Sequence, residues 1–153
     1  MFNVERSVGR LIEVTMRSPV TVEEVEEAGR LMGRALAPLT GRQGIICGDY
    51  TQAKVLTPEA SDTLSRIFRE YNDRIERSGL LIASTSAMQI LQMERVIREA
   101  ANPARRVFRD PMELILWLGE ILDPAERDRA HSFYITHGLS PSFRRRPASP
   151  LSQ

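Results

Sequence analysis

Residues 45–60, IICGDYTQAKVLTPEA, decide the fold expected for this chain. The run at 45–47 is short, apolar and bounded by glycines, which is typical of a strand buried on both faces. Thr57-Pro58-Glu59 then supplies a capping hydroxyl, a proline at the first helical position and an acid in the first turn. The stretch therefore predicts a buried strand, a loop over 48–56 and a helix that ends near Ser78-Gly79.

The strand–helix unit recurs toward the C-terminus. An apolar run at 80–83 is followed by a helical pattern at 86–101, and a second run at 106–108 is followed by one at 111–122. The helix at 111–122, which contains Trp117, is apolar on nearly all sides, and this predicts burial on all sides. Either a C-terminal helix folds back to cover it, or it forms a subunit interface.

The N-terminal segment has the pattern of a β-hairpin followed by a helix. Residues 2–4 and 11–16 flank a turn-prone SVGR, and the second run alternates apolar and polar side chains, which predicts one buried face. Thr21 and Glu24 have the spacing of a capping box, so a helix is expected to start there. The four glutamates at 23–27 spread around that helix and match its dipole, which does not favour a metal site.

Strands that alternate with helices imply parallel neighbours, because each helix provides the crossover. We therefore expect an α/β fold over residues 1–123, with a mixed, mostly parallel sheet, an N-terminal hairpin and four helices. A short C-terminal helix at 124–138 is expected to pack on this domain. Residues 139–153, rich in proline and serine with arginines at 144–146, predict a disordered tail.

Composition excludes several classes of protein. The chain has 153 residues, a formal net charge of +1 and one cysteine, so it fits one domain without a disulfide framework or a multi-cysteine zinc site. Near-neutral charge does not favour nucleic acid as a partner. No apolar run has the length of a membrane span, and no secretion segment is present, so we expect a cytoplasmic protein. Twenty arginines against one lysine indicate a GC-rich genome.

Residues that could carry catalytic chemistry are few. Cys47 lies inside the buried strand and is expected to fill the core rather than react. His131 and His137 are spaced too poorly to share a metal, and the glycines form no phosphate-binding loop. Asp49 and Glu59 are acids whose spacing alone does not bring them together. We therefore expect no enzyme activity, no metal and no cofactor.

The carboxyl ends of the strands are the predicted binding edge, since binding surfaces of open α/β sheets gather there. This edge holds Asp49, Tyr50 and Thr51, and after the next strand the hydroxyls of residues 84–86. Ser84 and Thr57, each before a helix, are candidate phosphorylation sites because a helix N-terminus stabilises a phosphate.

In this element order the chain resembles a STAS domain, the fold of anti-sigma-factor antagonists and of the cytoplasmic tails of sulfate transporters. The resemblance covers about residues 2–122 and is most local at IICGD followed by VLTPEA. It places Asp49 at the family's strand-end aspartate and Thr57 at the aspartate before its serines. The serine that the family phosphorylates falls on Pro58 or Glu59, neither of which accepts a phosphoryl group, and Thr57 is the nearest hydroxyl.

The resemblance implies a non-enzymatic regulatory module that binds a protein partner through residues 49–60. Asp49, Tyr50, Thr51, Thr57 and Glu59 are the predicted contacts. One alternative is a structural protein that self-associates as a homodimer through the Trp117 helix. The other is a small-molecule or lipid-binding domain, which the excess of apolar surface suggests.

Overall fold

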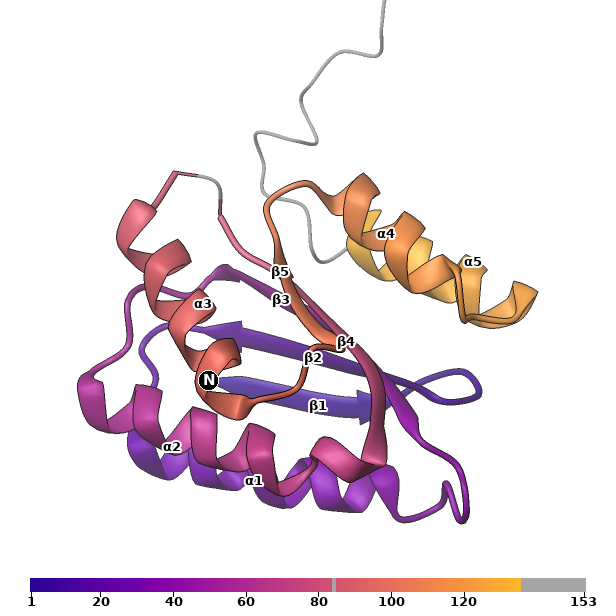
Figure 1. Cartoon of the computed structure of the whole chain (residues 1–153), viewed down its shortest axis with the longest axis horizontal. Coiled ribbons are helices and arrows are strands. Elements are labelled where there is room, and N and C mark those ends of the chain that lie inside the picture. The colour runs from indigo at the N-terminus through magenta and orange to yellow at the C-terminus, as the bar shows by residue number, and fades with distance from the viewer. Residues whose placement is uncertain (84, 136–153) are drawn as a thin grey trace, which may run out of the picture.

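The computed structural model describes residues 1–83 and 85–135. Its centre is one five-stranded sheet of order β1-β2-β3-β4-β5 (Figure 1). β1 and β2 form an antiparallel hairpin, and the remaining neighbours are parallel, so the predicted α/β fold with a mixed sheet is confirmed. The strands are β1 Phe2–Arg6, β2 Leu11–Arg17, β3 Gly44–Gln52, β4 Ile75–Leu81 and β5 Arg105–Phe108.

Helices cover both faces of the sheet. The three crossover helices lie together on one face, and the last two helices lie on the other (Figure 1). On the first face are α1 Val22–Leu36, α2 Pro58–Glu70 with a 3₁₀ turn at Asn72–Arg74, and α3 Ala87–Ala100; on the second are α4 Pro111–Gly119 and α5 Pro124–Phe133.

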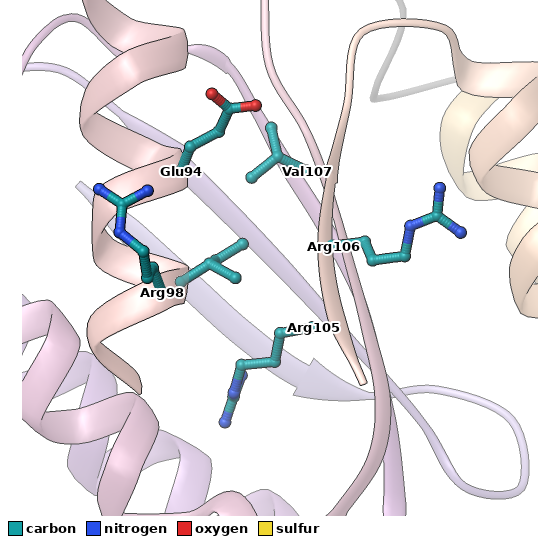
Figure 2. Close-up of a pocket in the computed structure, with 6 residues that line it drawn as sticks. Glu94, Arg98, Arg105, Arg106 and Val107 are labelled. Carbon is teal, nitrogen blue, oxygen red and sulfur yellow. The ribbon is translucent and has the colours of Figure 1, made fainter. Parts of the chain in front are cut away.

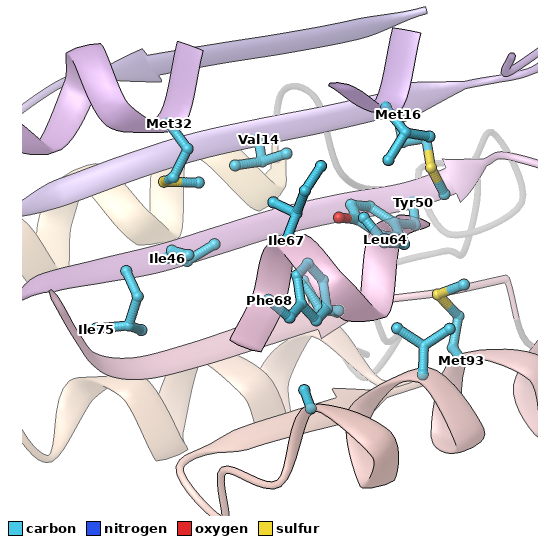
Figure 3. Packing of buried hydrophobic residues seen from close by; sticks show 14 of the residues in the cluster. Val14, Met16, Met32, Ile46, Tyr50, Leu64, Ile67, Phe68, Ile75 and Met93 are labelled. Atoms are coloured by element: carbon cyan, nitrogen blue, oxygen red, sulfur yellow. The ribbon is translucent and has the colours of Figure 1, made fainter. Parts of the chain in front are cut away.

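The sheet separates two apolar clusters. The larger one fills the space between the sheet and α1, α2 and α3, and Figure 3 shows Ile46 and Val14 of the strands meeting Ile67 and Phe68 of α2. The smaller cluster joins the other face to α4 and α5. Strand side chains alternate between the two clusters, since successive residues of a strand point to opposite faces.

The predicted helix starts are confirmed by their caps. The side-chain oxygens of Thr21, Thr57, Asp110 and Asp123 each accept a hydrogen bond from a backbone N–H in the first turn of α1, α2, α4 and α5. Each bond satisfies a donor that the helix itself leaves without a partner.

Two expected boundaries next to the central strands were wrong, and the helix expected at 111–122 ends earlier, at Gly119. β3 does not end at Cys47 but continues to Gln52, so five residues assigned to a loop belong to the sheet. α2 ends at Glu70, and Ile75, which lies inside the stretch expected to be helical up to Ser78-Gly79, begins β4 instead. Ile75 is apolar and buried in either arrangement, so periodicity did not distinguish them.

The expectation of a single buried face on β2 was also wrong. Leu11 and Glu13, which point away from the main core, are buried as well. They lie under α4 and α5, and the Glu13 carboxylate receives two hydrogen bonds from Arg129 of α5. A polar residue in the alternating pattern therefore marked an ion pair and not a solvent-exposed face.

α5 is tied to the sheet by further polar contacts. The Glu126 carboxylate, almost fully buried, accepts hydrogen bonds from the backbone N–H of Arg10 (2.8 Å) and of Asp123 (3.0 Å). The buried Tyr134 hydroxyl, just after α5, donates to Gly48 O at 3.1 Å, and Gly79 O lies 3.4 Å away. The C-terminal helix thus packs on the domain as an integral layer. The predicted tail at 139–153 lies outside the described residues.

Candidate functional site

Asp49, Tyr50 and Thr51 lie in the last part of β3. Asp49 and Tyr50 are only 3% and 2% exposed, so their side chains do not form an open surface. The backbone N–H and the hydroxyl of Thr51 both donate to Asp49 Oδ1, at 3.0 and 2.6 Å. Tyr50 packs edge-on against Phe2, and burial raises the pKa of its hydroxyl. Asp49 and Tyr50 therefore make internal contacts at the end of β3 and do not present a surface to a partner.

Thr57 and Glu59, by contrast, are exposed at the start of α2. Thr57 Oγ1 accepts a hydrogen bond from Ala60 N at 3.2 Å, and Pro58 occupies the first helical turn. This is the arrangement that the sequence predicted. Ser84, the other candidate phosphorylation site, lies outside the described residues.

Two glutamines of α3 hold the segment between β3 and α2 in place. Gln92 forms a pair of bonds with one residue: its Oε1 accepts from Leu56 N and its Nε2 donates to Leu56 O, both at 2.8 Å. One turn earlier, the buried Gln89 donates through Nε2 to Ala53 O at 2.7 Å and to Tyr50 O at 3.3 Å. The side chains three residues apart reach the same segment because they share a helix face.

An apolar groove lies beside this fixed segment. Val55 of the segment and Met88 and Leu91 of α3 are 48%, 66% and 63% exposed. Together with Pro58 they line an open hollow of about 330 Å³, whose polar walls are Ser61 and Asp62 of α2 and Gln92 and Arg95 of α3. We call this hollow the apolar groove.

The binding surface predicted from the sequence overlaps this groove only in part. Residues 53–58 belong to the predicted stretch, but Met88 and Leu91 do not. One signal was present: the 86–101 pattern has more apolar residues than a helix needs to cover a sheet, and Leu91 is among the surplus.

A second exposed apolar surface lies on α4. Leu114, Ile115 and Leu118 are buried against the sheet and α5, whereas Met112 and Leu116 are 49% and 69% exposed. The expectation of burial on all sides was therefore wrong for the outer side of this helix. Phe133 and Tyr134 fold back over the inner side, as one of the two explanations expected.

Trp117 itself is half-buried on the side of α4 that faces the arginines of β4 and β5. Its ring packs against Phe108, with centroids 5.4 Å apart, and the guanidinium groups of Arg77 and Arg106 lie over it at 4.8 and 5.1 Å. Arg77 also donates to Trp117 O at 2.6 Å and to Glu120 at 2.7 Å. These contacts hold the ring inside the domain.

The candidate reactive groups are dispersed. Cys47 is fully buried, as predicted, and burial raises the pKa of its thiol, with the Glu13 carboxylate adding to the shift. His131 is exposed on α5, and His137 lies outside the described residues. Asp49 is buried in β3 whereas Glu59 is exposed on α2. Among residues 1–83 and 85–135 no three histidine, cysteine or acidic side chains are grouped to hold a metal ion.

The fold and the groove define an α/β domain with an exposed apolar surface at the carboxyl end of its sheet. No family model, curated protein or solved structure matches the chain. Within the described part, no helix combines the length and the apolar character that crossing a bilayer requires.

Proposed function

We propose that this chain is a non-enzymatic regulatory module that binds a partner protein through the apolar groove. The observation that carries the proposal is the exposure of Val55, Met88 and Leu91 around one hollow. Scattered apolar residues on a surface are ordinary, but three large ones around a single hollow are typical of an interaction site.

The fixed backbone supports this proposal. Gln89 and Gln92 pin the segment from α3, and Ser18 Oγ accepts from Lys54 N at 2.7 Å on its other side. A surface held in one conformation loses little conformational entropy when a partner binds. The occupant that fits is a protein segment with a large aliphatic or aromatic anchor, which enters between Val55 and Leu91.

The rim of the groove adds a polar requirement. Asp62 of α2 and Arg95 of α3 line the groove from two different helices. Arg95 also forms an ion pair with Glu99, with Nε and Oε2 2.9 Å apart. Interfaces combine an apolar centre with a polar rim. A partner segment with a basic residue toward α2 and an acidic residue toward α3 would complement both.

The resemblance to STAS domains supports a binding surface at this same end of the sheet, because it implies that the partner binds at the start of the helix after the central strand. In the proposal Thr57 and Glu59 lie beside the groove and contact the partner. Asp49 and Tyr50, both buried, support the segment from beneath, next to the half-buried Thr51. Phosphorylation of the exposed Thr57 would then place negative charge at the edge of the interface and regulate binding.

The experiment compares two exposed leucines on different surfaces. Quantitative co-purification uses the wild-type chain, Leu91→Arg in the groove and Leu116→Arg on α4 as the matched control. The proposal expects at least one protein that wild type and Leu116→Arg retain equally and that Leu91→Arg loses at least tenfold. Equal recovery of every protein by both variants would overturn it. Circular dichroism melts confirm that both variants are folded.

A second candidate function is self-association, which the exposure of Met112 and Leu116 favours. A homodimer through α4 would bury both side chains against their symmetry copies. Sedimentation equilibrium at 100 µM subunit tests it: a dimer that Leu116→Arg converts to monomer supports this candidate, and a wild-type monomer removes it. The small-molecule or lipid-binding alternative stays a prediction.

A further inference from the structure

The strand β5 lies at one end of the sheet and is bonded on one side only. Ala104 O accepts from Ser78 N and Phe108 O from Ile82 N, each at 2.9 Å, so alternate residues 104, 106 and 108 direct their backbone groups toward β4. By the alternation of a strand, Val107 directs its N–H and C=O the other way. No strand of the described chain lies on that side.

A hollow runs along this edge. Glu94, Ile97 and Arg98 of α3 and residues 105–107 of β5 line about 370 Å³ of open space. Figure 2 shows Val107 turned toward α3 and Arg106 turned to the opposite side of the strand. A strand added here would therefore direct alternate side chains toward α3 and toward α4.

The edge is positively charged. Arg98, Arg106 and Arg109 are exposed, and none of the ion pairs found among the described residues includes them. Arg106 is held over the rings of Phe108 and Trp117, at 5.0 and 5.1 Å. Glu94 is the one acid that lines the hollow.

Arg105 contributes nothing to this surface charge, because its side chain points inward. Its Nε donates to Asn72 Oδ1 at 3.1 Å and its Nη2 to Phe68 O at 3.0 Å. The Arg105 N–H is bonded to Asn102 O, so the outward backbone groups of the edge are the C=O of Arg105 and the N–H and C=O of Val107, between Arg98 on one face and Arg106 on the other.

We propose that the β5 edge binds an extended acidic segment of another protein as a sixth strand of the sheet. Backbone hydrogen bonds to Val107 would give affinity, and acidic side chains on alternate faces would meet Arg98 and Arg106. A second copy of this chain is the poorer occupant, since pairing two such edges brings like-charged arginines together. This surface is separate from the apolar groove, so the two proposals stand or fall independently.

The test titrates the full chain with a panel of fluorescein-labelled ten-residue peptides in which glutamate alternates with valine, isoleucine, threonine or tyrosine. Matched peptides carry lysine in place of glutamate, or N-methyl groups on alternate amides. The protein variants are Val107→Pro, which removes the outward N–H and also restricts the backbone, and Val107→Ala as the control for loss of the side chain.

We expect at least one acidic peptide to bind, its lysine version not to bind, and its N-methylated version to bind on the order of tenfold more weakly. Val107→Pro should show the same weakening and Val107→Ala should not. If Val107→Pro fails to fold, the N-methylated peptides still decide, because they leave the protein unchanged. The proposal is wrong if no acidic peptide binds at 1 mM, or if N-methylation leaves affinity unchanged. A dimer in sedimentation that Val107→Pro converts to monomer and Leu116→Arg does not would also contradict it.

Discussion

Arg129 and Glu13 form an ion pair through two parallel hydrogen bonds, Nε to Oε2 at 2.5 Å and Nη2 to Oε1 at 2.8 Å, which joins α5 to β2. The Glu13 side chain is 6% exposed and that of Arg129 is 37% exposed. A buried carboxylate that loses its partner keeps its charge without compensation, and that is strongly destabilising.

Arg129→Ala should therefore lower the free energy of unfolding by about 2–3 kcal/mol, somewhat less than for a fully buried pair because water reaches Arg129. Urea denaturation at pH 7 measures this. The control is Arg30→Ala, whose exposed pair with Glu27 should contribute no more than about 0.5 kcal/mol. If both variants lose the same small free energy of unfolding, the ion pair of Arg129 with Glu13 does not stabilise the packing of α5 on the sheet.

Two substitutions at Thr57 separate stability from binding. Thr57→Ala removes the oxygen that accepts from Ala60 N and should cost about 0.5–2 kcal/mol of stability. Thr57→Asp keeps the cap, because aspartate caps at least as well, but adds negative charge where Glu59 and Asp62 already lie. Thermal melts should find Thr57→Asp as stable as wild type. A titration with the protein that co-purifies with wild type but not with Leu91→Arg should show weaker binding. Unchanged affinity would make Thr57 a cap and nothing more.

The segment beside the groove should loosen when Gln92 is shortened. Gln92→Ala deletes both hydrogen bonds to Leu56, which should accelerate hydrogen exchange at the Leu56 amide about tenfold and cost about 1–2 kcal/mol. Gln43→Ala is the control, since that exposed glutamine donates only to Asp73 O. Exchange by NMR that stays slow at Leu56 in Gln92→Ala would show that the segment is rigid for another reason.

Stability should fall as the solution becomes alkaline. Burial raises the pKa of the Cys47 thiol, so the folded chain keeps a proton that the unfolded chain releases above about pH 9. The folded state then binds more protons, and the free energy of unfolding decreases by about 1.4 kcal/mol per pH unit. Cys47→Ala should delay the onset by about one unit, to where Tyr50 and Tyr134, whose pKa values burial also raises, begin to ionise in the unfolded chain.

Arg105 changes the free energy of unfolding in the opposite direction as the pH rises. Burial lowers the pKa of its guanidinium to about 10, so above that pH the folded chain loses a proton that the unfolded chain keeps. This contribution makes the folded state more stable as the pH rises, and it offsets the loss from one of Cys47, Tyr50 and Tyr134. Urea midpoints between pH 8 and 11 should still fall, and the difference between wild type and Cys47→Ala should grow steadily with pH from about pH 9 upward. A flat wild-type profile would contradict this assignment.

The sequence predicted the element order because the caps are local. Thr21, Thr57, Asp110 and Asp123 mark helix starts through bonds that span two or three residues, so the signal lies in a few adjacent letters. The end of β3 was missed because glycine and aspartate ordinarily indicate a turn. Here Thr51 supplies Asp49 with two hydrogen bonds, which allows the strand to continue past it.

The candidate site was only partly predictable for a different reason. Thr57 and Glu59 were found from their place before a helix, whereas Met88 and Leu91 lie about thirty residues away in sequence, and only packing brings them beside Val55. The burial of Glu13 was hidden in the same way. Its partner is 116 residues distant, and no local pattern reports such a pair.

The position of α5 on the second face of the sheet has a consequence for synthesis. β2 leaves the ribosome 116 residues before Arg129, a delay on the order of ten seconds at ordinary elongation rates. During that interval the Glu13 carboxylate has no arginine, and Leu11 has no helix over it. The hairpin that begins the chain can therefore reach its final packing only when the last described helix arrives, so this face of the sheet stays uncovered for most of synthesis.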